Sequence, residues 1–168
     1  SPINPSIGRN TYADKAAEDA GVKSFVNLAD SETSAAKYAG YADSYYSTQN
    51  ICFLNLGVDF TTELNREGLK TAMEFIADEN SEAPFLVHCN EGQDRAGFVS
   101  ALLECLMGAT YDEVVADYMV TFYNYYGVQP GTDQYNQISN NIVRNLSTAF
   151  GLKMDDLAAA DLAAEAEE

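Results

Sequence analysis

Short apolar segments of strand-like composition alternate with helical segments over the first hundred residues of this chain. The strands predicted from β-branched and aromatic residues span 22–28, 51–56 and 84–88. The helices predicted from apolar spacing and cap residues span 11–20, 31–39, 63–78, 96–107, 110–126 and 133–148. This order predicts an α/β fold, in which a small central, mainly parallel sheet has helices on both faces.

The length of 168 residues is close to the size of one compact domain. We predict one domain over residues 1–150, followed by an acidic C-terminal tail over residues 151–168. Residues 155–168 include six acidic side chains and no basic one. This charge, together with the lack of bulky side chains, favours a solvated end.

The net charge of −17 excludes partners that bind by general attraction to a basic surface. Nucleic acid and anionic membrane surfaces belong to that class. Because no apolar run approaches the roughly 18 residues of a membrane span, we also expect no membrane insertion. The chain begins at Ser1 without Met or a signal segment, so localisation stays open between the cytoplasm and secretion after processing. The sequence leaves the oligomeric state open.

The three cysteines, Cys52, Cys89 and Cys105, do not form a disulfide framework, because their number is odd. With a single histidine in the chain, a structural zinc site is not expected either, and we predict no metal. Cys52 and Cys105 fall within a predicted strand and a predicted helix, where a cysteine is ordinarily an inert core residue. Cys89 differs because it follows a buried strand and precedes a helix.

The segment after that strand places Cys89 and Arg95 six residues apart at the entrance of a helix. We call residues 89–95 the cysteine loop. Backbone N–H groups at a helix N-terminus form a site for a tetrahedral oxyanion, and the same field lowers the pKa of a thiol. Arg95 can donate two parallel hydrogen bonds to such an anion. Gly92 permits the reversal of the chain, and Gly97 is expected to pack against the sheet.

This segment resembles the active-site loop of the cysteine-dependent protein tyrosine and dual-specificity phosphatases, especially the bacterial branch with Asp before Arg. The residues that carry the resemblance are His88, Cys89, Gly92, Asp94, Arg95 and Gly97. The resemblance covers about residues 1–150 and implies a phosphotyrosine phosphatase-like fold, although the family usually begins with further strands. It also implies a catalytic domain that needs no metal or organic cofactor.

The resemblance implies phosphoryl transfer through a cysteinyl-phosphate, with a phosphorylated protein or a small phosphomonoester as substrate. Cys89 is then the nucleophile and Arg95 the anion-binding group. For the acid there are two candidates: Asp59, which topology brings to the sheet edge of Cys89, is slightly preferred over Asp94. The other residues expected to bind substrate are His88, Asn90, Glu91, Gly92, Gln93, Ala96 and Gly97.

Two residues depart from the pattern of the family. Gln93 stands where the bacterial branch usually has Lys, so a cation that would favour phosphoinositides or inositol phosphates is absent. Ala96 stands where a Ser or Thr hydroxyl commonly helps the thiolate to leave. A weak or inactive phosphate- or phosphopeptide-binding relative and a phosphoinositide or inositol phosphate phosphatase are therefore the alternatives.

Overall fold

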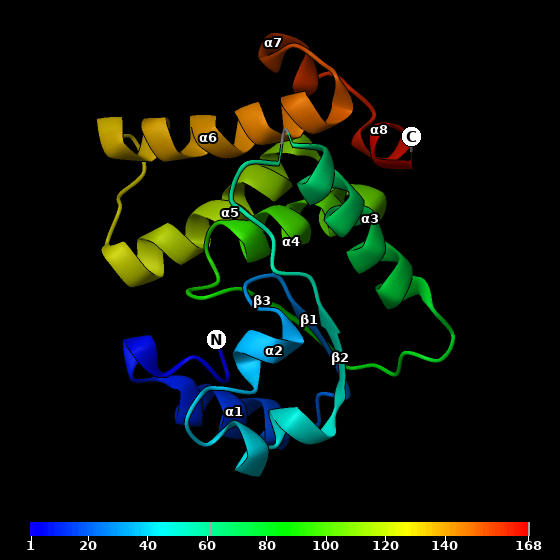
Figure 1. Ribbon diagram of the computed structural model, residues 1–168. Coiled ribbons are helices and arrows are strands. Elements are labelled where there is room, and N and C mark those ends of the chain that lie inside the picture. The colour runs from blue at the N-terminus through cyan, green and yellow to red at the C-terminus, as the bar shows by residue number, and fades with distance from the viewer. Residues whose placement is uncertain (61, 168) are drawn as a thin grey trace. The chain divides into compact units, whose positions relative to one another are not determined.

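The computed structural model describes residues 1–60 and 62–167 and divides into two compact parts, Ser1–Ala96 and Gly97–Glu168. The first part contains every strand of the described residues and the cysteine loop (Figure 1). The second part is helical. No helix of the described residues is long and apolar enough to cross a membrane.

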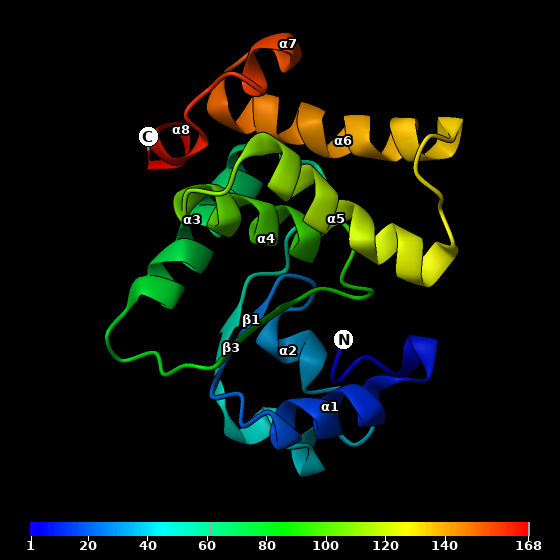
Figure 2. The ribbon, with the colours of Figure 1, turned by 180° about the vertical axis from the view of Figure 1, so that it is seen from behind.

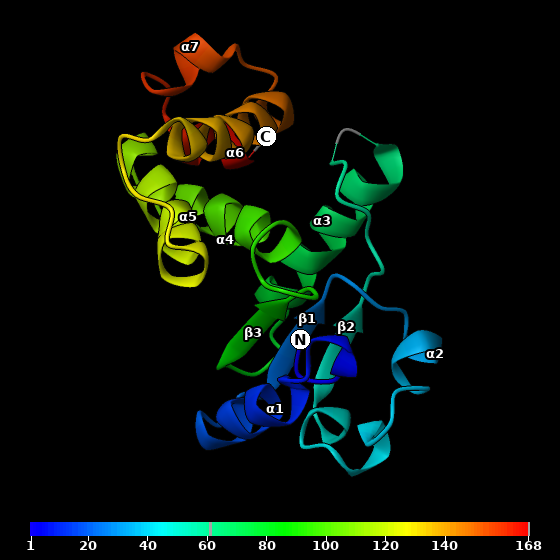
Figure 3. The ribbon, with the colours of Figure 1, turned by 90° about the vertical axis from the view of Figure 1, so that its left-hand side faces the viewer.

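Three parallel strands form the sheet of the first part. They are β1 (Ser24–Asn27), β2 (Asn50–Phe53) and β3 (Phe85–His88), and β1 lies between the other two (Figure 3). In this register Val26 pairs with Cys52 on one side and Val87 on the other. All four residues of β1 are buried. Because successive side chains point to opposite faces of a strand, both faces of β1 are covered, and the predicted α/β architecture is confirmed.

Helices and single-turn helices both occur in the first part, and two of its α-helices begin at side-chain caps. The helices are α1 (Asn10–Asp19), α2 (Glu32–Ala35), α3 (Glu63–Ala77) and the single-turn helices η1 (Pro5–Ile7), η2 (Tyr41–Asp43) and η3 (Tyr46–Thr48). Ser31 and Ser34 form a capping box at α2, and Thr62 accepts a hydrogen bond from Asn65 N at α3. The helix predicted over 31–39 is shorter, since it ends at Ala35.

An aromatic pair lies at the centre of the first part's core. The rings of Phe25, on β1, and Tyr46, at the start of η3, are tilted against each other with centroids 4.5 Å apart. Both side chains are fully buried, and Ala17 of α1 and Ala35 of α2 belong to the same cluster. The segment over 40–50, whose sequence shows no regular pattern, therefore contributes a core residue that packs against the sheet.

The second part contains most of α4 (Arg95–Leu106), α5 (Tyr111–Tyr126), α6 (Asp133–Phe150), α7 (Met154–Leu157) and α8 (Leu162–Glu167). The predicted capping box of Thr110 and Glu113 starts α5, and Gly127 ends it in the left-handed conformation. Helices α5 and α6 run side by side (Figure 2). Their sequence-predicted bounds agree with the structure to within two residues.

Two expectations for the second part are corrected. The segment after residue 150 is not simply a solvated end, because it forms α7 and α8 and buries Leu157 and Leu162. These two leucines are the buried apolar residues of the segment, and the many acidic residues around them led to the prediction of a solvated end. The predicted boundary between a domain over residues 1–150 and this C-terminal segment stays a prediction.

Gly97 packs against an aromatic ring, where the sequence analysis expected the sheet. A Cβ at this position would lie 2.8 Å from Cε2 of Tyr118 on α5.

Gly68 of α3 provides a test of the packing beside the sheet. A Cβ at this position would lie 2.2 Å from Cδ2 of the buried Leu56. We expect Gly68→Ala to lower the free energy of unfolding. The overpacking costs about 1–3 kcal/mol, which outweighs the roughly 1 kcal/mol that alanine gains over glycine in helix propensity. Urea denaturation measures the difference.

The matched control is the same change in a Leu56→Ala background, where the obstructing side chain is gone. There Gly68→Ala should stabilise the protein by about 1 kcal/mol through helix propensity alone. The same loss of stability in both backgrounds would contradict the packing explanation.

Candidate active site

The cysteine loop begins directly after β3 and ends at the first residue of α4. Cys89 is 3% exposed, and the backbone N–H of Gly92 donates to its Sγ over 3.3 Å. Gly92 has φ +90°, a left-handed conformation that side chains other than glycine rarely adopt. The reversal at Gly92 thus aims a backbone donor at the sulfur.

The guanidinium of Arg95 is fixed beneath the ends of the first two strands. Its Nη1 donates to the carbonyl oxygens of Leu28 over 3.3 Å and of Leu56 over 2.9 Å. These carbonyls follow β1 and β2, and the N–H of Leu56 donates to the Leu28 carbonyl over 2.8 Å. The arginine is therefore held at the carboxyl edge of the sheet, the same edge at which Cys89 lies.

Two buried polar atoms of this segment have no hydrogen-bond partner among the described residues. They are Nε of Arg95 and Oε1 of Gln93. Leaving a buried donor unsatisfied costs about 1–3 kcal/mol, and more for a charged group. An oxyanion held against the guanidinium would supply an acceptor for Arg95 Nε, so the residues present fit an anion such as phosphate.

His88 is buried behind the cysteine loop and is held at both ring nitrogens. Its Nδ1 lies 3.2 Å from the carbonyl oxygen of Cys89, and its Nε2 lies 2.9 Å from the hydroxyl of Tyr46. Because a carbonyl only accepts, Nδ1 carries the proton and Nε2 accepts from Tyr46. Burial lowers the pKa of His88 to about 3, so the ring is neutral at physiological pH. The neutral His88 ring, hydrogen-bonded at both nitrogens, orients the cysteine loop.

A second chain of hydrogen bonds reaches the loop at Asn90. Asn4 Nδ2 donates to Asn90 Oδ1 over 3.2 Å and to the Tyr38 hydroxyl over 3.1 Å. That hydroxyl donates to Asp30 over 2.7 Å. Burial and this carboxylate raise the pKa of Tyr38 to about 12. Asp30 is itself buried and also accepts from Asn27 Nδ2, so the chain ends on β1.

The candidate acids lie in exposed positions. Asp59 lies between β2 and α3, and its carbonyl accepts from Asn65 Nδ2 over 2.6 Å at the start of that helix. Asp94 is an exposed residue of the cysteine loop itself, as is Glu91. Asn65 is buried and also accepts from the N–H of Gly57 over 3.0 Å, so one amide side chain braces the segment that contains Asp59.

Sequence reasoning missed Tyr46, Asp30, Tyr38 and Asn4. Tyr46 and Tyr38 lie far from the cysteine loop in the chain, in segments without a motif, so no local signal could single them out. The one available hint was a cluster of tyrosines in an irregular stretch of an otherwise regular chain. Buried tyrosines need a partner for the hydroxyl, and such a partner is found only in the folded protein.

The comparison with family models agrees with this geometry. Residues 14–164 match the model described as the tyrosine phosphatase family. The chain belongs to the tyrosine phosphatase family. No curated protein and no solved structure matches the chain. Membership supports phosphatase activity in general and a phosphorylated substrate. Among the described residues no group of three or more His, Cys, Asp or Glu is placed to hold a metal ion.

The hydrogen bond between Tyr46 and His88 yields a prediction for this phosphatase. Tyr46→Phe leaves the buried Nε2 of His88 without a donor, so the free energy of unfolding should fall by about 1–3 kcal/mol. Urea denaturation at pH 7 measures it. Tyr41→Phe is the control, because Tyr41 is only half-buried and its ring packs edge-on against Tyr46. Equal losses in the two variants would contradict the role of this bond.

Proposed function

We propose that this chain is a phosphomonoester hydrolase that acts through a cysteinyl-phosphate intermediate formed on Cys89. The observation that carries the proposal is the Arg95 guanidinium, fixed by two strand carbonyls while its buried Nε has no partner among the described residues. A cation held in this way at the same sheet edge as a buried thiol is suited to bind a tetrahedral dianion. Family membership supports the same reaction class.

The reaction has two steps. In the first, the Cys89 thiolate attacks phosphorus, the S–P bond forms, and the bond from phosphorus to the leaving oxygen breaks as an acid protonates that oxygen. In the second, water attacks phosphorus and gives a proton to the carboxylate that the acid became in the first step, and the S–P bond breaks, which releases inorganic phosphate and restores both the thiolate and the acid. Arg95 and the backbone N–H groups of the loop stabilise the charge on the equatorial oxygens in both steps.

Either Asp59 or Asp94 supplies the proton in the first step. Asp59 is supported by its place after β2, since parallel strands bring their carboxyl ends to one edge of the sheet. The bracing of its segment by Asn65 also supports a defined position. Asp94 is supported by its place next to Arg95 within the loop. We prefer Asp59 slightly.

The substrate class we favour is a phosphorylated protein or a small phosphomonoester. Gln93 is uncharged and the chain carries −17, so multiply phosphorylated inositols or phosphoinositides receive no added cation at this position. Asp94 before Arg95 in the cysteine loop supports our proposal that the chain belongs to the bacterial branch of the tyrosine phosphatases.

A second function is favoured by Ala96. This buried residue has no hydroxyl to assist departure of the thiolate in the second step. A chain that binds a phosphate or phosphopeptide, or that turns over slowly after the first step, fits that feature. Hydrolysis of an aryl phosphate at a steady rate would exclude the binding function.

The nucleophile is tested with Cys89→Ser. A serine hydroxyl at this position is not ionised near neutral pH, so hydrolysis of 4-nitrophenyl phosphate should vanish while vanadate still binds. The assay pairs steady-state absorbance with calorimetric titration of vanadate. Cys52→Ser is the matched control, because Cys52 is half-buried in β2 and should leave the rate unchanged. Hydrolysis by Cys89→Ser at the wild-type rate would refute the mechanism.

The two candidate acids are separated by leaving-group dependence. If Asp59 is the acid, Asp59→Asn should lower the rate on tyrosyl or alkyl phosphates by roughly 10²–10⁴-fold and remove the high-pH limb of the rate profile. An activated nitrophenyl ester should lose less, because its oxygen leaves without a proton. Asp94→Asn should then lower the rate of hydrolysis to a similar extent for esters with good and with poor leaving groups. Strong leaving-group dependence only in Asp94→Asn would assign the acid to the loop.

A further inference from the structure

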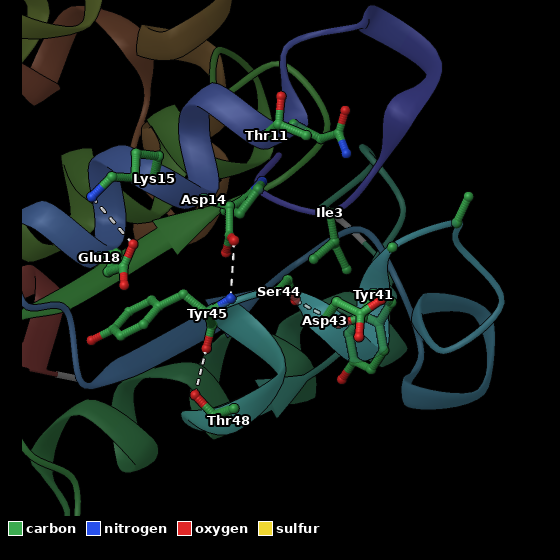
Figure 4. Close-up of a pocket in the computed structure, with 14 residues that line it drawn as sticks. Ile3, Thr11, Asp14, Lys15, Glu18, Tyr41, Asp43, Ser44, Tyr45 and Thr48 are labelled. Atoms are coloured by element: carbon green, nitrogen blue, oxygen red, sulfur yellow. Dashed lines mark hydrogen bonds and ion pairs between the residues drawn. The ribbon is translucent and has the colours of Figure 1, made fainter.

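A cavity of about 590 Å³ lies in the first part of the chain. One wall is a face of α1, and the opposite wall is formed by residues 39–48, with Ile3 beside them (Figure 4). The residues that line it include none of residues 89–95. Its volume falls within the 300–1,000 Å³ typical of small-molecule sites.

The charged groups at this cavity are mostly carboxylates. Asp14, Glu18 and Asp43 line it together with one cation, Lys15. The ammonium of Lys15 pairs with Glu18 over 3.3 Å and also with Asp19, a neighbour on α1. Its charge is therefore neutralised from its own helix, and the cavity keeps an excess of negative charge. That excess opposes an anion and favours a cation.

Asp14 presents a fixed carboxylate to this space. Its two oxygens accept the backbone N–H groups of Tyr45 over 3.0 Å and Tyr46 over 2.9 Å, as Figure 4 shows for Tyr45. A carboxylate has about four acceptor positions, so these two bonds leave acceptor capacity for a ligand. The ring of Tyr41 and the side chain of Ile3 also line the cavity. An aromatic ring and an aliphatic group suit the carbon chain beside an ammonium.

We propose that this cavity binds an organic cation, an alkylammonium group on an aliphatic chain, at a site separate from the phosphatase centre. The carboxylates of Asp14 and Asp43 receive the ammonium, and the half-buried ring of Tyr41 contacts the chain. The same chemistry occurs in free polyamines and in lysine side chains of peptides. Spermidine and trilysine therefore serve as the two probes.

The cavity is linked to the cysteine loop by hydrogen bonds. Asp14 holds the backbone of Tyr46, whose hydroxyl donates to His88, whose Nδ1 in turn donates to the carbonyl of Cys89. A cation that binds the remaining acceptor positions of Asp14 draws electron density from the oxygen that accepts the N–H of Tyr46 and so weakens that hydrogen bond. Occupation of the cavity should therefore change the reactivity of the Cys89 thiol.

Binding is measured by calorimetric titration of the wild-type chain with spermidine at low and at physiological salt. We expect one saturable site, whose affinity falls about fivefold in Asp43→Asn, the value of one partly exposed ion pair. Ala39→Arg, which places a guanidinium on an exposed lining residue, should abolish binding. Trilysine binding with the same sensitivity to these variants would assign the site to lysine side chains, whereas spermidine binding alone would assign it to free amines.

The matched control is Asp112→Asn, which removes the same charge from an exposed residue of α5. It should leave the spermidine affinity unchanged. An equal loss in Asp43→Asn and Asp112→Asn would show general attraction to an acidic protein and would overturn the site. Absence of saturable binding, or binding that survives Ala39→Arg, would overturn it as well.

The link to the loop is measured by the rate at which iodoacetamide alkylates Cys89, followed by mass spectrometry of its peptide. Saturating spermidine should change this rate by at least about twofold, and Tyr46→Phe should remove the change without removing binding. A constant alkylation rate would overturn the link and leave the site. Neither measurement requires turnover, so failure of the proposed hydrolase mechanism would be seen separately.

Discussion

The hydrogen bonds from Arg95 to the Leu28 and Leu56 carbonyls are the constraint on which the candidate site depends. Parallel strands end with carbonyl groups at one edge of the sheet, and buried carbonyls require donors. One guanidinium nitrogen supplies a donor to two neighbouring chain segments. The same bonds limit the positions of the remaining nitrogens of the arginine, and through the short loop they limit the position of Cys89.

Buried hydrogen-bonded side chains also support the position of the cysteine loop. His88 is neutral and hydrogen-bonded at both nitrogens, and Asp30 is buried with donors from Tyr38 and Asn27. In a medium of low polarity such bonds are strong, and an unsatisfied partner is costly. These pairs let the loop keep a defined conformation although it carries few apolar side chains of its own.

Local charge and global charge have opposite signs at this site. The chain carries −17, whereas the Arg95 guanidinium places a positive charge at the carboxyl edge of the sheet. An anionic substrate is thus attracted only at short range, where the guanidinium and the backbone donors act. This contrast supports our proposal of a single phosphate group, and not a large polyanion, as the group that binds at the site.

Local signals in the sequence are sufficient for the order of strands and helices and for the position of the cysteine loop. Capping by Ser31 and Thr110, the glycine at 127 and the spacing of Cys89 to Arg95 act within a few residues, so they can be predicted without the fold. The contact of Gly97 with Tyr118 could not be predicted. It depends on which helix packs there, and several helices have suitable faces.

The sequence pattern therefore determined the α/β class and the loop that suggests phosphoryl transfer. Tertiary structure alone decided the strand order β2-β1-β3, the pairing of Tyr46 with His88 and the cavity beside α1. The physical reason is the range of the interactions. Caps and turns join near neighbours in the chain, whereas Tyr46 and His88 are 42 positions apart and meet only after the sheet has formed.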